Sequence, residues 1–392
     1  MDPAETRSFN LKALLILSLG HLVTDIYQGA LPAIMPFLKE RLSLTYSMAG
    51  VIILASNIAS SVIQPLFGMI SDKKEKPLLI PVGCLISGIG FCLIPFMSQY
   101  AVIVSLVVVS GLGIAAFHPE GFRTAHRFTG ARAAAGMSIF SLGGNLGFAL
   151  GPVLSLLIVT RLGFSYLPGM IVFAFLFLAA LSFLWKTLAV PERPEEEHPL
   201  TGQKGTGNGF PPAMVILLGT VIIRSCIHAG LTSYIPFYYI DYLKGDPVYA
   251  GKLVSFFLLG GVVGTVTGAP LADRWGHKRY LVVTMLMSSC ILPLILFVKG
   301  IMLSAVLAVF GMVLISTFTV TIVMAQRLLP KNLGVASGLM VGFAIGTGGI
   351  GVMLLGVLAD NFGVPVALKS ITLLPIAGFL LSLMVRYPDR QA

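Results

Sequence analysis

The residues best suited to chemistry in this chain lie inside apolar sequence. The segment GHLVTDIYQGALPAIMP begins at Gly20. Its residues His21, Asp25 and Gln28 follow the i, i+4, i+7 spacing that places side chains on one face of a helix. An ionised carboxylate at the centre of a bilayer costs roughly 2.5–3.5 kcal/mol. An aspartate kept there therefore needs a partner or a proton.

A second polar face follows at an offset of 200 residues. Arg224, His228 and Thr232 share the helical spacing, and Gln28 corresponds to His228 at this offset. Duplicated halves related by pseudo-symmetry should place the two faces opposite each other at similar depth. We therefore predict that Asp25 and Arg224 come close enough to interact, directly or through water or substrate.

A third group of polar residues stands in AAFHPEGFRTAHR, which begins at Ala115. Its Pro–Gly interruption loosens the helix, and Glu120 and Arg123, three apart, are expected to pair. A buried carboxylic acid can load and release a proton near neutral pH, where histidines also titrate. Asp25, Glu120 and His118 are therefore the candidates for proton coupling.

Each of these residues also has a structural interpretation. Asp25 and Arg224 could form a structural ion pair, and the histidines could simply hydrogen-bond across helices. Glu120 could lie in the headgroup region, where its charge would cost little. The functional interpretation is favoured because ionisable residues inside a membrane usually mark a pathway or a relay.

Composition assigns the chain to the integral membrane proteins. Of 392 residues, 56% are hydrophobic and 11% are charged, against about 25% charged in soluble proteins. A helix needs roughly 20 apolar residues to cross the hydrocarbon core, and continuous apolar runs exclude the short alternating strands of a membrane barrel. Windows of this kind predict an all-α protein with twelve transmembrane helices, near 11–37, 47–71, 77–97, 100–124, 133–159, 164–188, 213–240, 250–271, 279–298, 301–325, 334–358 and 365–387.

The basic residues predict the orientation. With the N-terminus inside, 18 of the 26 Lys and Arg residues lie on the cytoplasmic side and 7 outside, which is the positive-inside pattern. Both termini are then cytoplasmic, and the first apolar run is too long for a signal peptide. The net charge of +10 is spread over short loops, which argues against nucleic-acid binding. The four cysteines have no CxxC spacing and predict neither a disulfide nor a metal site.

The chain is predicted to consist of two halves. A polar segment rich in Pro, Gly and charge, residues 190–212, is expected to be a cytoplasmic linker between six-helix bundles at 1–189 and 213–392. Matched pairs such as AHRF at Ala125 and AQRL at Ala325 recur at the same offset and in the same order. Duplicated halves with a central binding site are typical of secondary transporters.

Two loops strengthen this interpretation. The sequences GMISDKKEKP, from Gly68, and APLADRWGHKR, from Ala269, resemble the cytoplasmic loop motif of the major facilitator superfamily. Their aspartates stand at helix ends beside cations and could form charge-assisted locks that break when the halves rock; the alternative is a set of positive-inside anchors. The first copy has Glu75 where the motif has glycine. The predicted cytoplasmic gate comprises Gly68, Asp72, Lys73, Asp273, Arg274 and Gly276.

The fifth predicted helix carries GGNLGFALGP, with Gly147 and Gly151 four apart and followed by Pro152. Small residues at that spacing let helices approach closely. The element is similar to one found in proton-driven exporters of the superfamily, which favours export. Ordinary helix packing is nearly as good an explanation.

Two longer motifs, LGHLVTDIYQGALPAIMPFL and GLGIAAFHPEGFR, resemble the fosmidomycin resistance protein group of the major facilitator superfamily. The resemblance implies a proton-coupled exporter of fosmidomycin or of similar small polar compounds. A phosphonate is anionic, and a guanidinium suits it best. The substrate candidates are then Arg224, His21, Gln28, His228 and Arg123.

Three other functions can be compared with the features of the sequence: an uptake symporter, an intramembrane enzyme and a receptor. An uptake symporter for an organic anion would need the same charges. An intramembrane enzyme could use FHPEG, but this is not the HExxH spacing and the sequence shows no third ligand cluster. A receptor should carry a soluble domain. We expect no metal and no cofactor beyond the proton gradient, a small-molecule substrate, no nucleic acid, and a monomer in the cytoplasmic membrane.

Overall fold

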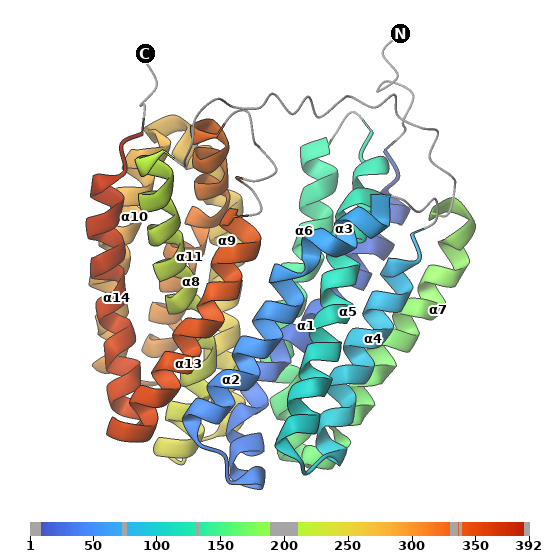
Figure 1. The fold of residues 1–392 in the computed structure, drawn as a ribbon, viewed down its shortest axis with the longest axis horizontal. Helices are drawn as coiled ribbons and strands as arrows, with labels where there is room; N and C mark the ends of the chain where they lie inside the picture. Colours follow the sequence, from blue (N-terminus) through green and yellow to red (C-terminus); the bar gives the residue numbers. More distant parts are fainter. Residues whose placement is uncertain are drawn as a thin grey trace. The chain divides into compact units, whose positions relative to one another are not determined.

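The computed structural model describes residues 9–72, 77–130, 133–188, 211–329, 336 and 339–387. Nearly all of them are helical, and no strand occurs in these ranges (Figure 1). Within these residues, eleven helices are long and apolar enough to cross a membrane, and the shorter apolar helix Gly346–Phe362 overlaps the eleventh predicted window, 334–358. The predicted all-α membrane fold is confirmed; the orientation of the termini stays a prediction.

The chain divides into two compact units. One comprises Met1–Ser43 and Ala55–Arg193, and the other comprises Leu44–Leu54 and Pro194–Ala392. The helices of the first unit are α1 (Leu11–Leu42), α3 (Gln64–Asp72), α4 (Leu79–Leu93), α5 (Tyr100–Arg127), α6 (Ala133–Arg161) and α7 (Ile171–Leu188). The helices of the second unit are α8 (Pro212–Pro236), α9 (Pro247–Trp275), α10 (His277–Ile291), α11 (Gly300–Leu328), α13 (Ala344–Phe362) and α14 (Val364–Met384).

Short irregular turns extend several helices. Turns of 3₁₀-helix cover Ile94–Phe96, Phe164–Met170 and Leu292–Leu296, and π-helical turns cover Ile58–Val62, Phe237–Tyr242 and Leu339–Phe343. The internal repeat is visible in this order, because α5 starts at Tyr100 and α11 at Gly300. Gly111 lies near Ala59 of the π-helical turn Ile58–Val62, and Gly311, 200 residues later, lies near Phe257 of α9.

The helix α2 (Tyr46–Asn57) is divided between the units, since its first residues group with the second unit. The Asp360 carboxylate of α13 accepts hydrogen bonds from the backbone N–H groups of Tyr46 and Ser47, at 2.7 and 2.9 Å, and from the Ser47 hydroxyl. The Tyr46 hydroxyl donates to Asp241 at 2.9 Å. A carboxylate from another helix thus caps the start of α2, where the first N–H groups have no intrahelical partner.

Close packing fixes the helix that carries Asp25. The residues Gly143, Gly147 and Gly151 of α6 lie directly on the backbone of α1, and a Cβ added at Gly147 would stand 2.1 Å from the Leu22 carbonyl oxygen. Only glycine allows such an approach. The stripe therefore sets the distance between α1 and α6.

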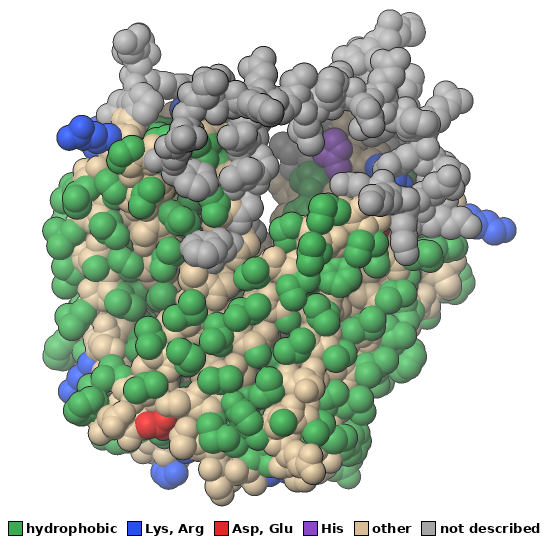
Figure 2. All heavy atoms as spheres, viewed as in Figure 1, with side chains coloured by type: hydrophobic (Ala, Val, Ile, Leu, Met, Phe, Trp, Pro, Cys, Tyr) green, Lys and Arg blue, Asp and Glu red, His purple; other side chains and the backbone are tan. Residues whose placement is uncertain are grey.

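Large apolar side chains cover the lipid-facing surface. Phe183 on α7 and Ile301 on α11 are 87% and 89% exposed, and hydrophobic side chains spread over the face seen in Figure 2. Such a surface would be unfavourable in water, and it is suited to contact with hydrocarbon.

Candidate functional site

A cluster of three titratable side chains lies inside the first unit. His21 and Asp25 come from α1, and His118 comes from α5. The His21 Nε2 lies 3.3 Å from one Asp25 carboxylate oxygen, and the His118 Nε2 lies 3.3 Å from the other. Asp25 is only 8% exposed. Each carboxylate oxygen thus faces its own imidazole nitrogen.

The backbone orients both imidazole rings. The His21 Nδ1 is 3.0 Å from the Phe140 carbonyl oxygen, and the His118 Nδ1 is 2.8 Å from the Ile114 carbonyl oxygen. A carbonyl oxygen only accepts, so each Nδ1 carries a proton and donates it. Both Nε2 atoms are then left to face Asp25.

Aromatic and small residues hold the His21 ring in place. The ring stacks on Phe140, with centroids 4.4 Å apart, and lies edge-on to the His118 ring at 5.0 Å. Gly144 of α6 makes room for it, because a Cβ there would stand 2.3 Å from the His21 Nε2. The position of His21 therefore depends on the absence of a side chain at residue 144.

The donor atoms of this cluster lie within 4.8 Å of one another. The cluster joins His118 of FHPEG to His21 and Asp25, a grouping that the sequence spacing did not reveal. Such a set of two imidazoles and one carboxylate can bind protons or share a cation. The orienting carbonyl groups would serve either use.

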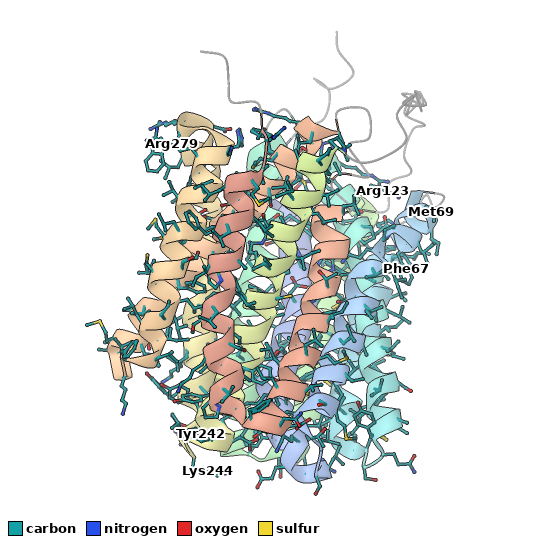
Figure 3. The ribbon with its side chains drawn as sticks, turned by 60° about the vertical axis from the view of Figure 1, so that its left-hand side comes forward. Phe67, Met69, Arg123, Tyr242, Lys244 and Arg279 are labelled. Carbon is teal, nitrogen blue, oxygen red and sulfur yellow. The ribbon has the colours of Figure 1, made fainter. Side chains whose placement is uncertain are left out.

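The expected pair on α5 is present. The Arg123 guanidinium lies 3.3 Å from a Glu120 carboxylate oxygen, and the Glu120 side chain is fully buried. Glu120 is therefore shielded by the surrounding side chains, and its depth in the bilayer stays a prediction. Figure 3 shows Arg123 at the same end of the first unit as Met69. Gln28, further along the α1 stripe, donates to the Ser60 hydroxyl at 3.4 Å.

In the second unit, Arg224 of α8 is 5% exposed. Its guanidinium donates to the Thr321 hydroxyl at 3.2 Å and lies over the Phe318 ring at 5.1 Å, both on α11. Among the described residues of this unit, no carboxylate forms an ion pair with it. His228, one turn later, has its ring centroid 5.5 Å from that of Phe257.

The predicted approach of Asp25 and Arg224 stays a prediction. Asp25 has two histidine partners in the first unit, and Arg224 has a hydroxyl and an aromatic ring in the second. Each residue has these partners from its own unit. An interaction between Asp25 and Arg224 would add to these contacts or replace them during a transport cycle.

The predicted gate is partly within the described residues. On the second copy, the Asp273 carboxylate lies 3.2 Å from the His277 Nε2, and Gly276 has φ of +92°, which favours glycine between α9 and α10. Arg274 stands in the last turn of α9. Arg279 follows on α10, and Figure 3 places it and Lys244 at opposite ends of this unit.

On the first copy, the α3 helix holds Gly68 and ends at Asp72. A Cβ added at Gly68 would only reach ordinary contact with Pro119, at 3.8 Å. The Asp72 side chain and Lys73 lie outside the described residues. The partner of Asp273 was missed at the sequence level, although His277 follows it at the i, i+4 spacing.

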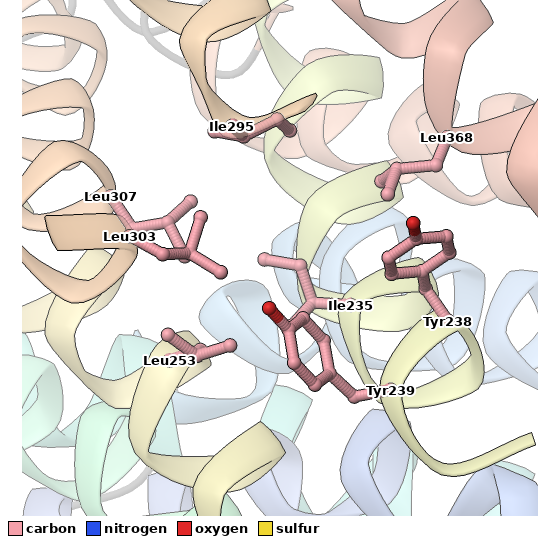
Figure 4. Close-up of a pocket in the computed structure, with 8 residues that line it drawn as sticks. All are labelled: Ile235, Tyr238, Tyr239, Leu253, Ile295, Leu303, Leu307 and Leu368. Carbon is pink, nitrogen blue, oxygen red and sulfur yellow. The ribbon is translucent and has the colours of Figure 1, made fainter. Parts of the chain in front are cut away.

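An apolar pocket in the second unit is a poor candidate for a charged ligand. Leucines, isoleucines and the rings of Tyr238 and Tyr239 line it (Figure 4). None of its lining residues is charged, and neither Arg224 nor His228 belongs to it. These tyrosines therefore pack against aliphatic side chains.

Comparison with known proteins places this arrangement in a family. A model of the Major Facilitator Superfamily matches residues 17–350 and 246–392. The chain is 33% identical over 378 residues to an uncharacterized MFS-type transporter, YfnC, of Bacillus subtilis (strain 168), covering 95% of this chain and 92% of that protein. It is 32% identical over 372 residues to the fosmidomycin resistance protein of Escherichia coli (strain K12), covering 93% and 90%.

Solved structures share the fold. The nucleoside transporter NupG superposes with a TM-score of 0.79 at 14% identity, over 96% of this chain and all of that one. A bacterial homolog of the human lysosomal transporter Spinster, in an inward-facing and occupied conformation, gives 0.74 at 11% identity, over 95% and 96%. With the helical repeat and the relatives above, these matches show that the chain is a multi-pass membrane transporter belonging to the major facilitator superfamily.

Proposed function

We propose that this protein exports small anionic compounds, with fosmidomycin as the model substrate, in exchange for protons across the cytoplasmic membrane. The observation that carries the proposal is the buried Asp25 carboxylate held between two histidines. A carboxylate in a bilayer needs neutralisation, and an imidazole beside it that gains a proton becomes a cation that can supply it reversibly. The similarity to the fosmidomycin resistance protein supports this substrate class and the direction of export.

Arg224 is the proposed anchor for the anion. A guanidinium has five N–H donors in a planar fork that matches the oxygens of a phosphonate. Thr321 takes one of its hydrogen bonds, and Phe318 covers one side of its plane. The remaining donors are suited to a phosphonate, with His228 one turn away on the same helix face.

The exchange of substrate for protons follows because the Asp25 cluster and the substrate anion compete for the positive charge of Arg224. In this scheme, Asp25 and its histidines hold protons taken from outside, and loss of these protons to the cytoplasm leaves a negative cluster that can interact with Arg224. The substrate anion displaces that interaction when it binds. Glu120, paired with Arg123, is the second proposed proton carrier. Both termini are proposed to be cytoplasmic, and the protein is proposed to act as a monomer.

The test is expression in a bacterium sensitive to fosmidomycin, followed by assays in everted vesicles. Wild-type protein should confer resistance, and adding fosmidomycin to energised vesicles should release protons from their interior. Asp25→Asn should abolish gradient-driven transport but retain binding. Arg224→Gln should weaken substrate binding by about 10- to 100-fold, since a hydrogen bond to a charged group contributes roughly 1.5–3 kcal/mol.

The matched control is Arg161→Gln, which removes an exposed guanidinium at the end of α6. It should leave resistance and transport unchanged. Full gradient-driven transport by Asp25→Asn would reject Asp25 as a carrier. Proton movement in the same direction as the substrate would instead identify a symporter.

A further inference from the structure

We propose that the cluster of His21, Asp25 and His118 is a two-proton site, in which full loading places one proton on each Nε2 and changes the charge of the cluster from −1 to +1. This inference deepens the proposed function and rests on its proton coupling. It assigns His21, predicted above as a substrate residue, to the proton site instead.

The tautomer of each histidine follows from its backbone partner. Both Nδ1 atoms donate to backbone carbonyls, those of Phe140 and Ile114. When either imidazole is neutral, its proton is therefore on Nδ1, and its Nε2 presents a lone pair. This nitrogen lies 3.3 Å from an Asp25 oxygen that also presents lone pairs.

The number of protons between these atoms decides which contacts are favourable. With no proton, two acceptor–acceptor contacts stand at 3.3 Å and the cluster carries −1. With one proton, one contact becomes a hydrogen bond and the other stays repulsive. With two protons, each imidazolium Nε2–H donates to its own carboxylate oxygen, and the charge is +1. Only this last state satisfies both observed contacts.

Few charged groups surround the cluster within the described part of the first unit. The helices α3, α4, α6 and α7 and the π-helical turn Ile58–Val62 pack against α1 or α5. Their described charged residues are Arg161 and Lys186, each in the last turn of its helix, and α4 adds only the thiols Cys84 and Cys92. The Asp72 side chain at the end of α3 lies outside the described residues.

On α5 itself, the nearest charged residue in sequence is Glu120, which pairs with Arg123, and His126 and Arg127 stand in its last turn. On α1, Tyr27 donates its hydroxyl to the Met170 carbonyl, while Lys12 stands in the first turn and Lys39, Glu40 and Arg41 stand near the last. Within the described part of the unit, His21, Asp25 and His118 therefore form one set, in which the protonation of any one group changes the proton affinity of the other two.

The two-proton site predicts a steep pH dependence. When both protons must be present, a tenfold change in proton concentration changes the loaded fraction by up to about 100-fold, and by about tenfold for a single proton. Gradient-driven transport should show the steep dependence in the wild type and the shallow one in His21→Gln and His118→Gln. His126→Gln, which removes an exposed histidine at the end of α5, is the control and should keep the steep dependence.

A direct measurement avoids reliance on transport. The wild-type protein, labelled with ¹⁵N-histidine and reconstituted in nanodiscs, is titrated between about pH 5 and pH 8 by NMR. Signals are assigned through the single Gln variants. Both His21 and His118 should be doubly protonated at the acidic end, and each should lose its Nε2 proton while keeping its Nδ1 proton. Uptake by one histidine alone, or a neutral form protonated at Nε2, would overturn the proposal.

A second arm of the experiment tests whether the cluster binds a metal ion instead of protons. The titration is repeated after chelator treatment and with equimolar Zn²⁺. Unchanged proton uptake in the chelated sample supports the two-proton site. Nε2 signals that respond to Zn²⁺ and stay constant with pH overturn it. If the NMR result holds while transport ignores the proton gradient, the proposed function fails and the site stands.

Discussion

At the residue scale, the central question is how a buried aspartate is tolerated. The Asp25 side chain is 11% exposed, and its two carboxylate oxygens each face a histidine nitrogen. A charge without such partners would be costly in hydrocarbon. The same contacts that make Asp25 tolerable also allow the cluster to change its charge, which a permanent ion pair with lysine or arginine would not permit near neutral pH.

Gly144→Ala tests the position of His21. The new Cβ would stand 2.3 Å from the His21 Nε2, so the ring must move away from Asp25 while His118 keeps its place. We expect at least a tenfold loss of transport at limiting proton concentration and a shallower pH dependence. Gly169→Ala is the matched control, because no atom lies within 4 Å of a Cβ at that position. Equal pH profiles for the two variants would contradict the role assigned to Gly144.

At the element scale, glycines decide which helices can touch. The stripe of Gly143, Gly147 and Gly151 brings α6 onto the backbone of α1, four residues apart at each step. It resembles the exporter element noted in the sequence, and its role in the structure is close packing. This packing places the Phe140 carbonyl beside His21, so a structural stripe also orients a side chain of the proposed proton site.

Gly147→Ala tests this packing. A Cβ 2.1 Å from the Leu22 carbonyl oxygen would push the two helices apart, because backbone atoms cannot rotate away. Overpacking of this kind costs about 1–3 kcal/mol. We expect a lower midpoint of thermal unfolding for the purified protein than for Gly169→Ala, measured in the same detergent. A stability equal to that of the control would show that α1 and α6 separate without cost.

At the scale of the whole molecule, transport requires that a change in one unit alters the other. The charge of the cluster in the first unit and the anion site around Arg224 in the second are the proposed partners. Their coupling is a free energy, and a double-mutant cycle measures it without knowledge of the distance between them.

Asp25→Asn, Arg224→Gln and the double variant should give non-additive changes in the affinity of purified protein for fosmidomycin. If the two groups interact, Asp25→Asn should raise the affinity while Arg224 is present and change it little in Arg224→Gln, and the interaction energy should be about 0.5–3 kcal/mol. The pair Asp25→Asn with Arg161→Gln is the control and should be additive. Additivity for both pairs would mean that Asp25 and Arg224 act independently.

The sequence by itself determined the class and the layout of the molecule. Long apolar windows require helices in a bilayer, because every backbone polar group must be satisfied within its own segment. The offset of 200 residues predicted the repeat that appears in α5 and α11. Helical spacing also placed His21 and Asp25 on one face, and Glu120 beside Arg123, since neighbours on a helix surface follow from its period.

Only the tertiary structure decided which helix faces which. Periodicity gives the face on which Asp25 lies, but the partner on the opposite helix depends on how closely α1, α5 and α6 pack. His118 reaches Asp25 from α5, and the Phe140 carbonyl of α6 fixes the His21 tautomer. A backbone carbonyl has no signature in the sequence, and a contact between distant segments arises from packing rather than from local pattern. For that reason, the proton count of the cluster could be argued only from the folded chain.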